Sequence, residues 1–239
     1  MLLTEEQIKR INIKANADIR FENSWYWLFA KEGKIPLFPW RQNMRLRNMQ
    51  KEVANGSIYD ISVIKCECTE QKCFSVSALA MREFEICEWL LNDTVISVFA
   101  QTDNKNVFHV IGRMKSGVRC SIDITNGLNI GTRETNRHEI ISSVGELCDL
   151  PVGMQYASED TYVFRGDCAV PQFYTEVIIE NELYTREEAQ LIRDALTLVC
   201  DEGARAERIK RFAYLENVVK WAEKSSAKSS LTEVCHEEC

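Results

Sequence analysis

The sequence predicts an α+β fold: one large, open, mostly antiparallel sheet with helices packed on one of its faces. Segments rich in β-branched residues follow one another from Ser57 to about residue 180, and the short links between them favour antiparallel neighbours. Helical patterns stand at both ends of this run, as in a sheet covered by helices on one side. The segment 117–125 alternates apolar and polar residues, which is typical of a strand with one buried face.

Residues 1–56 are predicted to form a helical and linker segment. Thr4 and Gln7 make a capping box, in which each side chain accepts a hydrogen bond from a backbone N–H at the start of a helix. Apolar residues at helical spacing follow, namely Ile8, Ile11 and Ala15. A possible strand at 17–22 comes next.

The rest of this segment is rich in aromatic residues. The stretch 24–43 holds two of the four prolines, and we expect it to run irregularly over the surface. Its tryptophans, Trp25, Trp27 and Trp40, are expected to pack against the protein rather than stack on a ligand. A helix is predicted at 45–56, ended by an Asn-Gly pair.

Residues 57–223 are predicted to form the sheet domain. Strands are expected at 58–68, 94–101, 106–115, 117–125, 136–143, 145–150, 160–166 and 171–180, with a helix at 77–91. Within 117–125, two sets of side chains point to opposite faces: Val118, Cys120, Ile122 and Ile124 on one, and Arg119, Ser121, Asp123 and Thr125 on the other.

The chain is predicted to close with helices. Thr185 and Glu188 form a second capping box. An apolar stripe follows, made of Ala189, Ile192, Leu196 and Val199. The pattern of 204–224 is that of a further amphipathic helix, and the Ser-rich residues 224–239 are expected to be a disordered tail.

The composition is that of an ordinary globular protein, with 45% apolar and 27% charged residues among 239. The net charge of -7 argues against a nucleic-acid partner, which requires a basic surface. No run approaches the roughly 18 apolar residues of a membrane helix, and the start of the chain turns acidic too early for a signal peptide. We therefore expect a soluble cytoplasmic protein without a membrane partner.

Ten cysteines raise the question of a metal site. Two clusters are candidates: Cys66, Cys68 and Cys73 in the first, and Cys235, His236 and Cys239 in the second. Neither pairs two C-x2-C units at the spacing of a structural zinc site. We expect reduced thiols and no bound metal, with a cysteine-rich metal or redox module as an alternative.

Several catalytic motifs are missing from the chain. It has no G-x-G-x-x-G fingerprint, no P-loop and no G-x-S-x-G nucleophile elbow. His109 and His138 lie inside predicted strands and are interpreted as structural. The spacing of the histidines suggests no Cys–His or Ser–His couple. We therefore expect no self-sufficient catalytic apparatus and no cofactor bound by this chain alone.

The order of six segments, from Leu2 to about Arg211, carries a resemblance to a known family. The segments are MLLTEEQIKRINIKANADIRFE, RNMQKEVANGSIYDISVIKCE, SALAMREFEICEWLLNDTVISVFAQ, NVFHVIGRMKSGVRCSIDIT, RHEIISSVGELCD and YTREEAQLIRDALTLVCDEGARAERIKR. In this order they resemble the family of glucose–fructose oxidoreductase, inositol dehydrogenase and MocA. Proteins of that family join an N-terminal Rossmann domain to a C-terminal α/β domain.

The resemblance implies that this chain corresponds to the C-terminal, dihydrodipicolinate-reductase-like domain. The Rossmann core, on the order of 100 residues, is absent from it, as is the family's Glu-Lys-Pro motif, so a truncated or naturally short chain is expected. Residues 1–56 would then be left from the crossover between the domains. NAD(P) is the implied cofactor only where a Rossmann domain is supplied.

The family's catalytic residues have been replaced in this chain. Counting back from Trp89, Arg82 stands where the family has its proton-transferring His, and Glu85 where it has an Asp. Arginine has no acceptor lone pair and stays protonated, so Arg82 is limited to binding an anion, whereas Glu85 keeps a carboxylate that can act as a base. The alternative is an i,i+3 ion pair on a solvated helix face.

We therefore expect a substrate-binding and oligomerisation domain that is not catalytic alone. The alternative is one part of an NAD(P)-dependent sugar or cyclitol dehydrogenase, completed by a missing or separate Rossmann domain. The polar face with Ser121, Asp123 and Thr125 suits a homodimer through the open sheet face.

Overall fold

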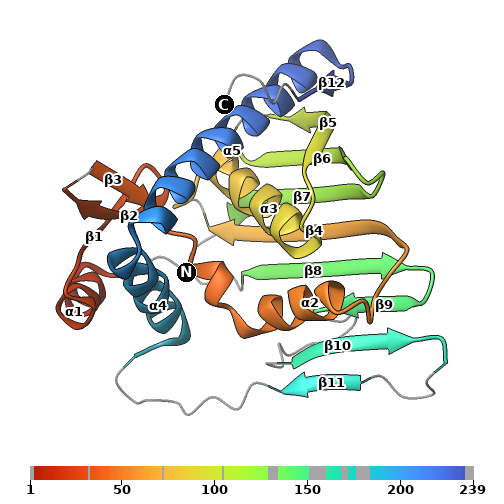
Figure 1. The fold of residues 1–239 in the computed structure, drawn as a ribbon. Coiled ribbons are helices and arrows are strands. Elements are labelled where there is room, and N and C mark those ends of the chain that lie inside the picture. Colours follow the sequence, from red (N-terminus) through yellow and green to blue (C-terminus); the bar gives the residue numbers. More distant parts are fainter. Residues whose placement is uncertain are drawn as a thin grey trace.

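The fold was analysed in a computed structural model, which describes residues 3–31, 33–71, 73–103, 105–128, 134–150, 160–167, 172–175 and 184–234. It is an α+β fold built on one large sheet, as predicted (Figure 1). The strand order in this sheet is β11-β10-β9-β8-β4-β7-β6-β5-β12. Strands β4 and β7 run parallel, and all other neighbouring strands of this sheet are antiparallel.

The strands lie close to their predicted positions. Their bounds are β4 (Ile61–Gln71), β5 (Val95–Thr102), β6 (Val107–Met114), β7 (Arg119–Leu128), β8 (Thr135–Ser142), β9 (Gly145–Cys148), β10 (Asp160–Arg165), β11 (Gln172–Thr175) and β12 (Thr232–Glu233). The alternation predicted for β7 is confirmed, since Cys120, Ile122 and Ile124 are buried while Arg119 and Asp123 are exposed.

Helices cover one face of this sheet (Figure 1). They are α2 (Met44–Ala54), α3 (Val76–Leu91) and α5 (Glu202–Lys228). The main core lies between them and the sheet, and includes Phe84, Phe108, Ile122 and Leu215. On the opposite face, β6 leaves Val107 and Ile111 exposed. Among the described residues no helix combines the length and the apolar character needed to cross a membrane.

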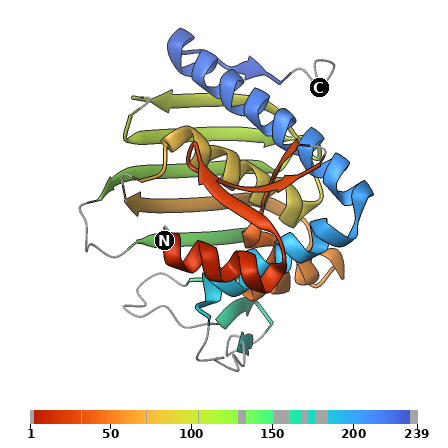
Figure 2. The same ribbon diagram turned by 90° about the vertical axis from the view of Figure 1, so that its left-hand side faces the viewer.

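An N-terminal unit, made of α1 (Glu5–Ala15), β1 (Asp18–Glu22), β2 (Trp25–Ala30) and β3 (Gly33–Pro36), has its own small sheet. It packs with α4 (Arg186–Cys200) around a second core that includes Ile11, Ile19 and Leu191. The unit lies beside one end of the large sheet's strands in Figure 1, and Figure 2, seen from that side, shows it in front of the sheet.

The prediction of an irregular path for 24–43 was wrong. This stretch forms β2, β3 and a 3-10 helix, η1 (Pro39–Gln42). Asn23 and Ser24 both have a left-handed backbone, with φ of 52° and 63°, which lets two residues turn β1 back into β2. The aromatic residues do pack, as predicted: Trp25 is buried, with its ring edge-on to those of Phe38, Trp40 and Phe212.

The prediction of a disordered tail at 224–239 was also wrong for residues 224–234. Helix α5 continues to Lys228, and β12 pairs antiparallel with β5. Two of the serines that suggested disorder instead form hydrogen bonds from α5 to the backbone of β5. The Oγ of Ser225 accepts the N–H of Ala100 (3.2 Å) and donates to the carbonyl of Ser230 (2.5 Å), while Ser226 accepts the N–H of Thr102. Residues 235–239, with Cys235, His236 and Cys239, lie outside the described residues.

Gly145, at the start of β9, allows a close approach of two strands. Its φ is +153°, and a Cβ built there would lie 1.8 Å from the carbonyl oxygen of Phe164 on β10. We expect Gly145→Ala to lower the free energy of unfolding by more than about 2 kcal/mol, because the backbone of β10 must move. Chemical denaturation measures this loss. Gly166→Ala is the control, since nothing lies within 4 Å of the added carbon, and equal losses in both variants would contradict the prediction.

Candidate functional site

A cavity of about 570 Å³ lies where α3, β4 and β8 meet α4 and the N-terminal unit. Its wall combines aromatic side chains with amide and charged groups. The residues that matter for its chemistry are Trp25, Tyr26, Trp40, Asn43, Arg45, Glu70, Arg82, Asn136, His138, Asp149, Arg186 and Gln190. Cavities of this size and mixed character hold small ligands in many proteins.

Helix α3 supplies Arg82 to the cavity wall and carries three carboxylates. It starts at an N-cap, Ser75, whose side chain accepts the N–H of Ala78. The helix is buried on most sides because the sheet lies under it while α2 and α5 flank it. Its three carboxylates, Glu83, Glu85 and Glu88, are therefore at most 2% exposed. Buried carboxylates require cationic or hydrogen-bonding partners.

The guanidinium of Arg82 forms part of the cavity wall and is held by four groups. Its Nε donates to Glu83 Oε1 (2.7 Å) and its Nη1 to Glu70 Oε1 (3.2 Å). Its Nη2 lies 2.8 Å from Asn136 Oδ1 and 2.9 Å from the Sγ of Cys68. Burial alone would raise the pKa of Glu83, but Arg82 and His138 together lower it to about 2.

Glu85 takes no part in these contacts. It is fully buried and accepts hydrogen bonds from the Nε of Arg41 (2.8 Å) and from the indole N–H of Trp40. The interpretation of Arg82 and Glu85 as an ion pair on a solvated face was therefore wrong, because η1 covers this side of α3. Arg82 lines the cavity, whereas Glu85 anchors Trp40, which lines it. A catalytic role for either residue stays a hypothesis.

His138 is hydrogen-bonded at both ring nitrogens, as expected for a structural histidine. Its Nδ1 lies 2.7 Å from Asp149 Oδ2 and its Nε2 2.9 Å from Glu83 Oε2. Burial would lower the pKa of His138, but these two carboxylates raise it well above its usual value. No pattern in the sequence predicts that His138 lines a cavity next to Arg82. His109, by contrast, pairs with Asp123 on the open face of the sheet.

The cysteine cluster predicted as a candidate metal site does not come together. Cys66 and Cys68 share the helix-facing side of β4, as expected, but the Sγ of Cys68 contacts Arg82 and Cys73 is exposed. In the described part of the chain, Cys66, Cys68, Cys87, Cys120 and Cys148 are buried and form no disulfide. The group of potential ligands that does converge there is Cys66, Glu83 and His138.

Comparisons with known proteins identify the fold. No family model and no curated protein matches this sequence. Among solved structures, an oxidoreductase domain protein from Kribbella flavida matches with a TM-score of 0.66 at 11% identity, over 83% of this chain and 66% of its own. A levoglucosan dehydrogenase in complex with NADH matches with a TM-score of 0.65 at 15% identity, over 83% and 65%.

An inositol dehydrogenase homolog from Azotobacter vinelandii, complexed with NADH and myo-inositol, matches with a TM-score of 0.60 at 9% identity, over 82% and 63%. This chain thus spans only 63–66% of the length of these three proteins. It has the fold of such oxidoreductases over most of its own length, and the coverage is consistent with their C-terminal domain. The resemblance stated from the sequence is confirmed at the level of the fold.

Glu70 allows the charge network to be tested with one small change. Its Oε1 accepts hydrogen bonds from both Arg82 and Asn136, so Glu70→Gln keeps this oxygen and removes only the charge. Burial would raise the pKa of Glu70, but Arg82 lowers it below the ordinary value of 4.5. The stability from this carboxylate is therefore present above pH 4.5 and lost as the pH falls toward its folded-state pKa.

We expect Glu70→Gln to cost about 1 kcal/mol of unfolding free energy at pH 7, and the difference from wild type to shrink below pH 4.5. Urea denaturation at a series of pH values measures both. Glu67→Gln is the matched control on the same strand, because its side chain is 52% exposed and its ion pair with Arg137 is 3.5 Å long, so its loss should cost only about 0.2 kcal/mol. A difference for Glu70→Gln that is constant from pH 7 to acid would exclude this account.

Proposed function

We propose that this chain acts as the substrate-binding domain of an oxidoreductase-type fold and is not catalytic by itself. The observation that carries the proposal is the state of Arg82 at the cavity wall. A guanidinium held by Glu70, Glu83, Asn136 and Cys68 cannot take up or release a proton at neutral pH. Glu85, at the other position that corresponds to a catalytic residue of the resembling family, accepts hydrogen bonds from Arg41 and Trp40.

The walls of the cavity favour a small polyhydroxylated ligand such as a sugar or cyclitol. The Oδ1 of Asn43 caps α2, so Asn43 supplies only its NH2 donor, while the amide of Gln190 supplies a donor and an acceptor. The rings of Tyr26 and Trp40 supply flat apolar surface. Such a combination of few polar groups and aromatic walls suits ligands that have both hydroxyl groups and C–H faces. The cationic side chains of Arg82 and His138 are paired with the carboxylates of Glu70, Glu83 and Asp149. These groups thus leave no large net charge to select an ion.

A second candidate is one part of an NAD(P)-dependent sugar or cyclitol dehydrogenase, completed by a separate or missing Rossmann domain. The observation that favours it is the coverage, since about a third of each longer neighbour has no counterpart in this chain. In this case NAD(P) would be held by the other domain, and a residue of that domain would have to supply the proton transfer that Arg82 cannot.

Ligand titration tests the first proposal. We expect calorimetry to show no saturable NADH or NADPH binding below about 1 mM, because a bare substrate domain offers no cradle for a pyrophosphate. We expect saturable binding of at least one member of a panel of sugars and cyclitols that includes myo-inositol and levoglucosan. Gln190→Ala should weaken that binding about tenfold by removing one hydrogen-bonding group.

The control for the panel is Gln172→Ala, which removes the same side chain from an exposed position on β11 and should leave the affinity unchanged. A micromolar dissociation constant for either dinucleotide would overturn the non-catalytic proposal. Binding of no panel member, with the protein folded, would reject the polyhydroxylated ligand.

We also propose that the chain forms a homodimer through the open face of the sheet. This face carries Val107 and Ile111, which are 46% and 45% exposed, beside the His109–Asp123 pair. Apolar residues surrounded by polar ones suit a self-complementary two-fold contact.

A single charge tests the proposed dimer. We expect wild type to have the mass of two chains in light scattering after size exclusion, and Ile111→Lys to shift it to one, because the lysine would be desolvated against its symmetry mate. Ile13→Lys places the same change on α1, where the side chain is 77% exposed, and should keep the wild-type mass. If wild type has the mass of one chain even at high protein concentration, the proposed dimer is wrong.

A further inference from the structure

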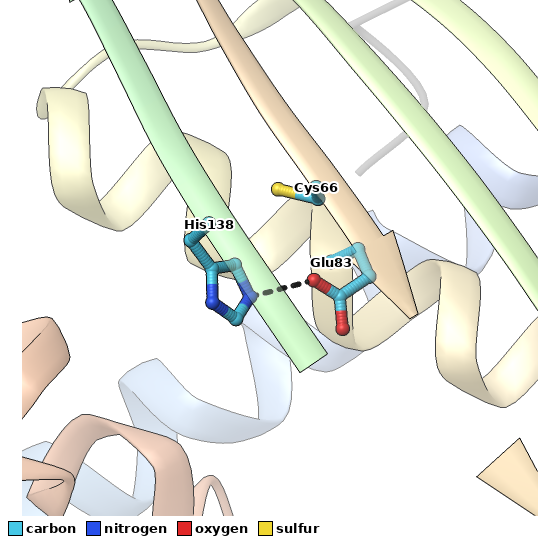
Figure 3. Close-up of side chains that lie close together, drawn as sticks. All are labelled: Cys66, Glu83 and His138. Carbon is cyan, nitrogen blue, oxygen red and sulfur yellow. Dashed lines mark hydrogen bonds and ion pairs between the residues drawn. The ribbon is translucent and has the colours of Figure 1, made fainter. Parts of the chain in front are cut away.

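We propose that Cys66, Glu83 and His138 form a binding site for a divalent, thiophilic metal ion such as Zn²⁺. One potential ligand atom from each lies within 4.8 Å of the others, and all three side chains are buried. They come from β4, α3 and β8 and point toward one another in Figure 3. The inference concerns these side chains alone and does not rest on the proposed ligand of the cavity.

The fold fixes the relative positions of these ligands. Cys66 and His138 are direct partners in the antiparallel pairing of β4 with β8, so their side chains stand next to each other on the helix-facing side. Glu83 faces them from α3. One turn further along α3 is Cys87, whose Sγ lies 3.4 Å from that of Cys66, but the group whose ligand atoms all lie within 4.8 Å of one another consists of Cys66, Glu83 and His138.

The ligand atoms are oriented by partners on their far sides. Asp149 accepts from the backbone N–H of His138 (2.7 Å) and lies 2.7 Å from its Nδ1, so the Nε2 is turned toward the cluster. Arg82 binds the Oε1 of Glu83 at 2.7 Å and leaves the Oε2 facing His138. A carboxylate behind a metal-binding histidine is a common way to fix the tautomer and the ring orientation of a ligand.

An ion is compatible with the charge and the access of the site. Without it, a protonated His138 and the thiol of Cys66 stand beside ionised Glu83. A divalent ion would displace two protons, one from the His138 Nε2 and one from the Cys66 thiol, so that the three groups together with the ion carry the same total charge as the three groups without it. His138 also lines the cavity, which gives an ion a way in from solvent.

Cobalt titration tests the site. The protein is the full chain with Cys73, Cys168, Cys200, Cys235 and Cys239 changed to Ser, so that the thiols at these five positions cannot supply the signal. We expect about one equivalent of Co²⁺ to bind with a thiolate-to-metal charge-transfer band and the strong visible bands of a tetrahedral site, and Zn²⁺ to displace it. Cys66→Ala should abolish the charge-transfer band or lower the affinity at least about 100-fold.

The matched control is Cys148→Ala, which removes another buried thiol from a neighbouring strand and should keep both the band and the stoichiometry. Asp149→Asn gives a second readout, with an affinity about 10–100-fold weaker while the band remains. Circular dichroism checks that each variant is folded. A folded parent protein without a thiolate band, or a Cys66→Ala variant that keeps both the band and the parent affinity, would overturn the proposal.

Discussion

The burial of three carboxylates on one helix is the constraint on which the rest of the structure depends. Glu83, Glu85 and Glu88 of α3 are each at most 2% exposed, and a buried carboxylate without a partner destabilises a fold by several kcal/mol. Each finds its partner in a different element: His138 of β8, Arg41 of η1 and Arg211 of α5. Helix α3 thereby fixes one strand of the sheet, the end of the N-terminal segment and the long C-terminal helix with respect to one another.

The same constraint shapes the base of the cavity. Arg82 and His138 are positively charged groups there, and both are paired with carboxylates within hydrogen-bonding distance. A group whose proton is held by two ionised neighbours is a poor acid or base at neutral pH. The network thus supports the proposed binding role better than proton transfer.

Local patterns predicted most of the fold, because alternation and capping are properties of neighbouring residues. The capping boxes at Thr4 and Thr185 and the alternating strand at 117–125 all lie where the sequence placed them. The environment of α3 could not be predicted in this way. Glu85 is covered by Arg41, 44 positions earlier, and Glu88 by Tyr214, 126 positions later. The sequence around Arg82 and Glu85 favours an exposed ion pair, because it does not show that these distant segments pack against α3.

The identity of residue 82 is tied to its surroundings rather than independent of them. Glu70 and Glu83 both approach this side chain, so the position requires a cation that stays charged at every physiological pH. The same two carboxylates would raise the pKa of a histidine there, as Glu83 and Asp149 raise that of His138, but a histidine ring has only two N–H groups and could not replace the four contacts that the guanidinium makes. Placing a proton-transferring group at this position would therefore require changes in β4 and α3 together. This interdependence is what a wall maintained for binding and stability would show.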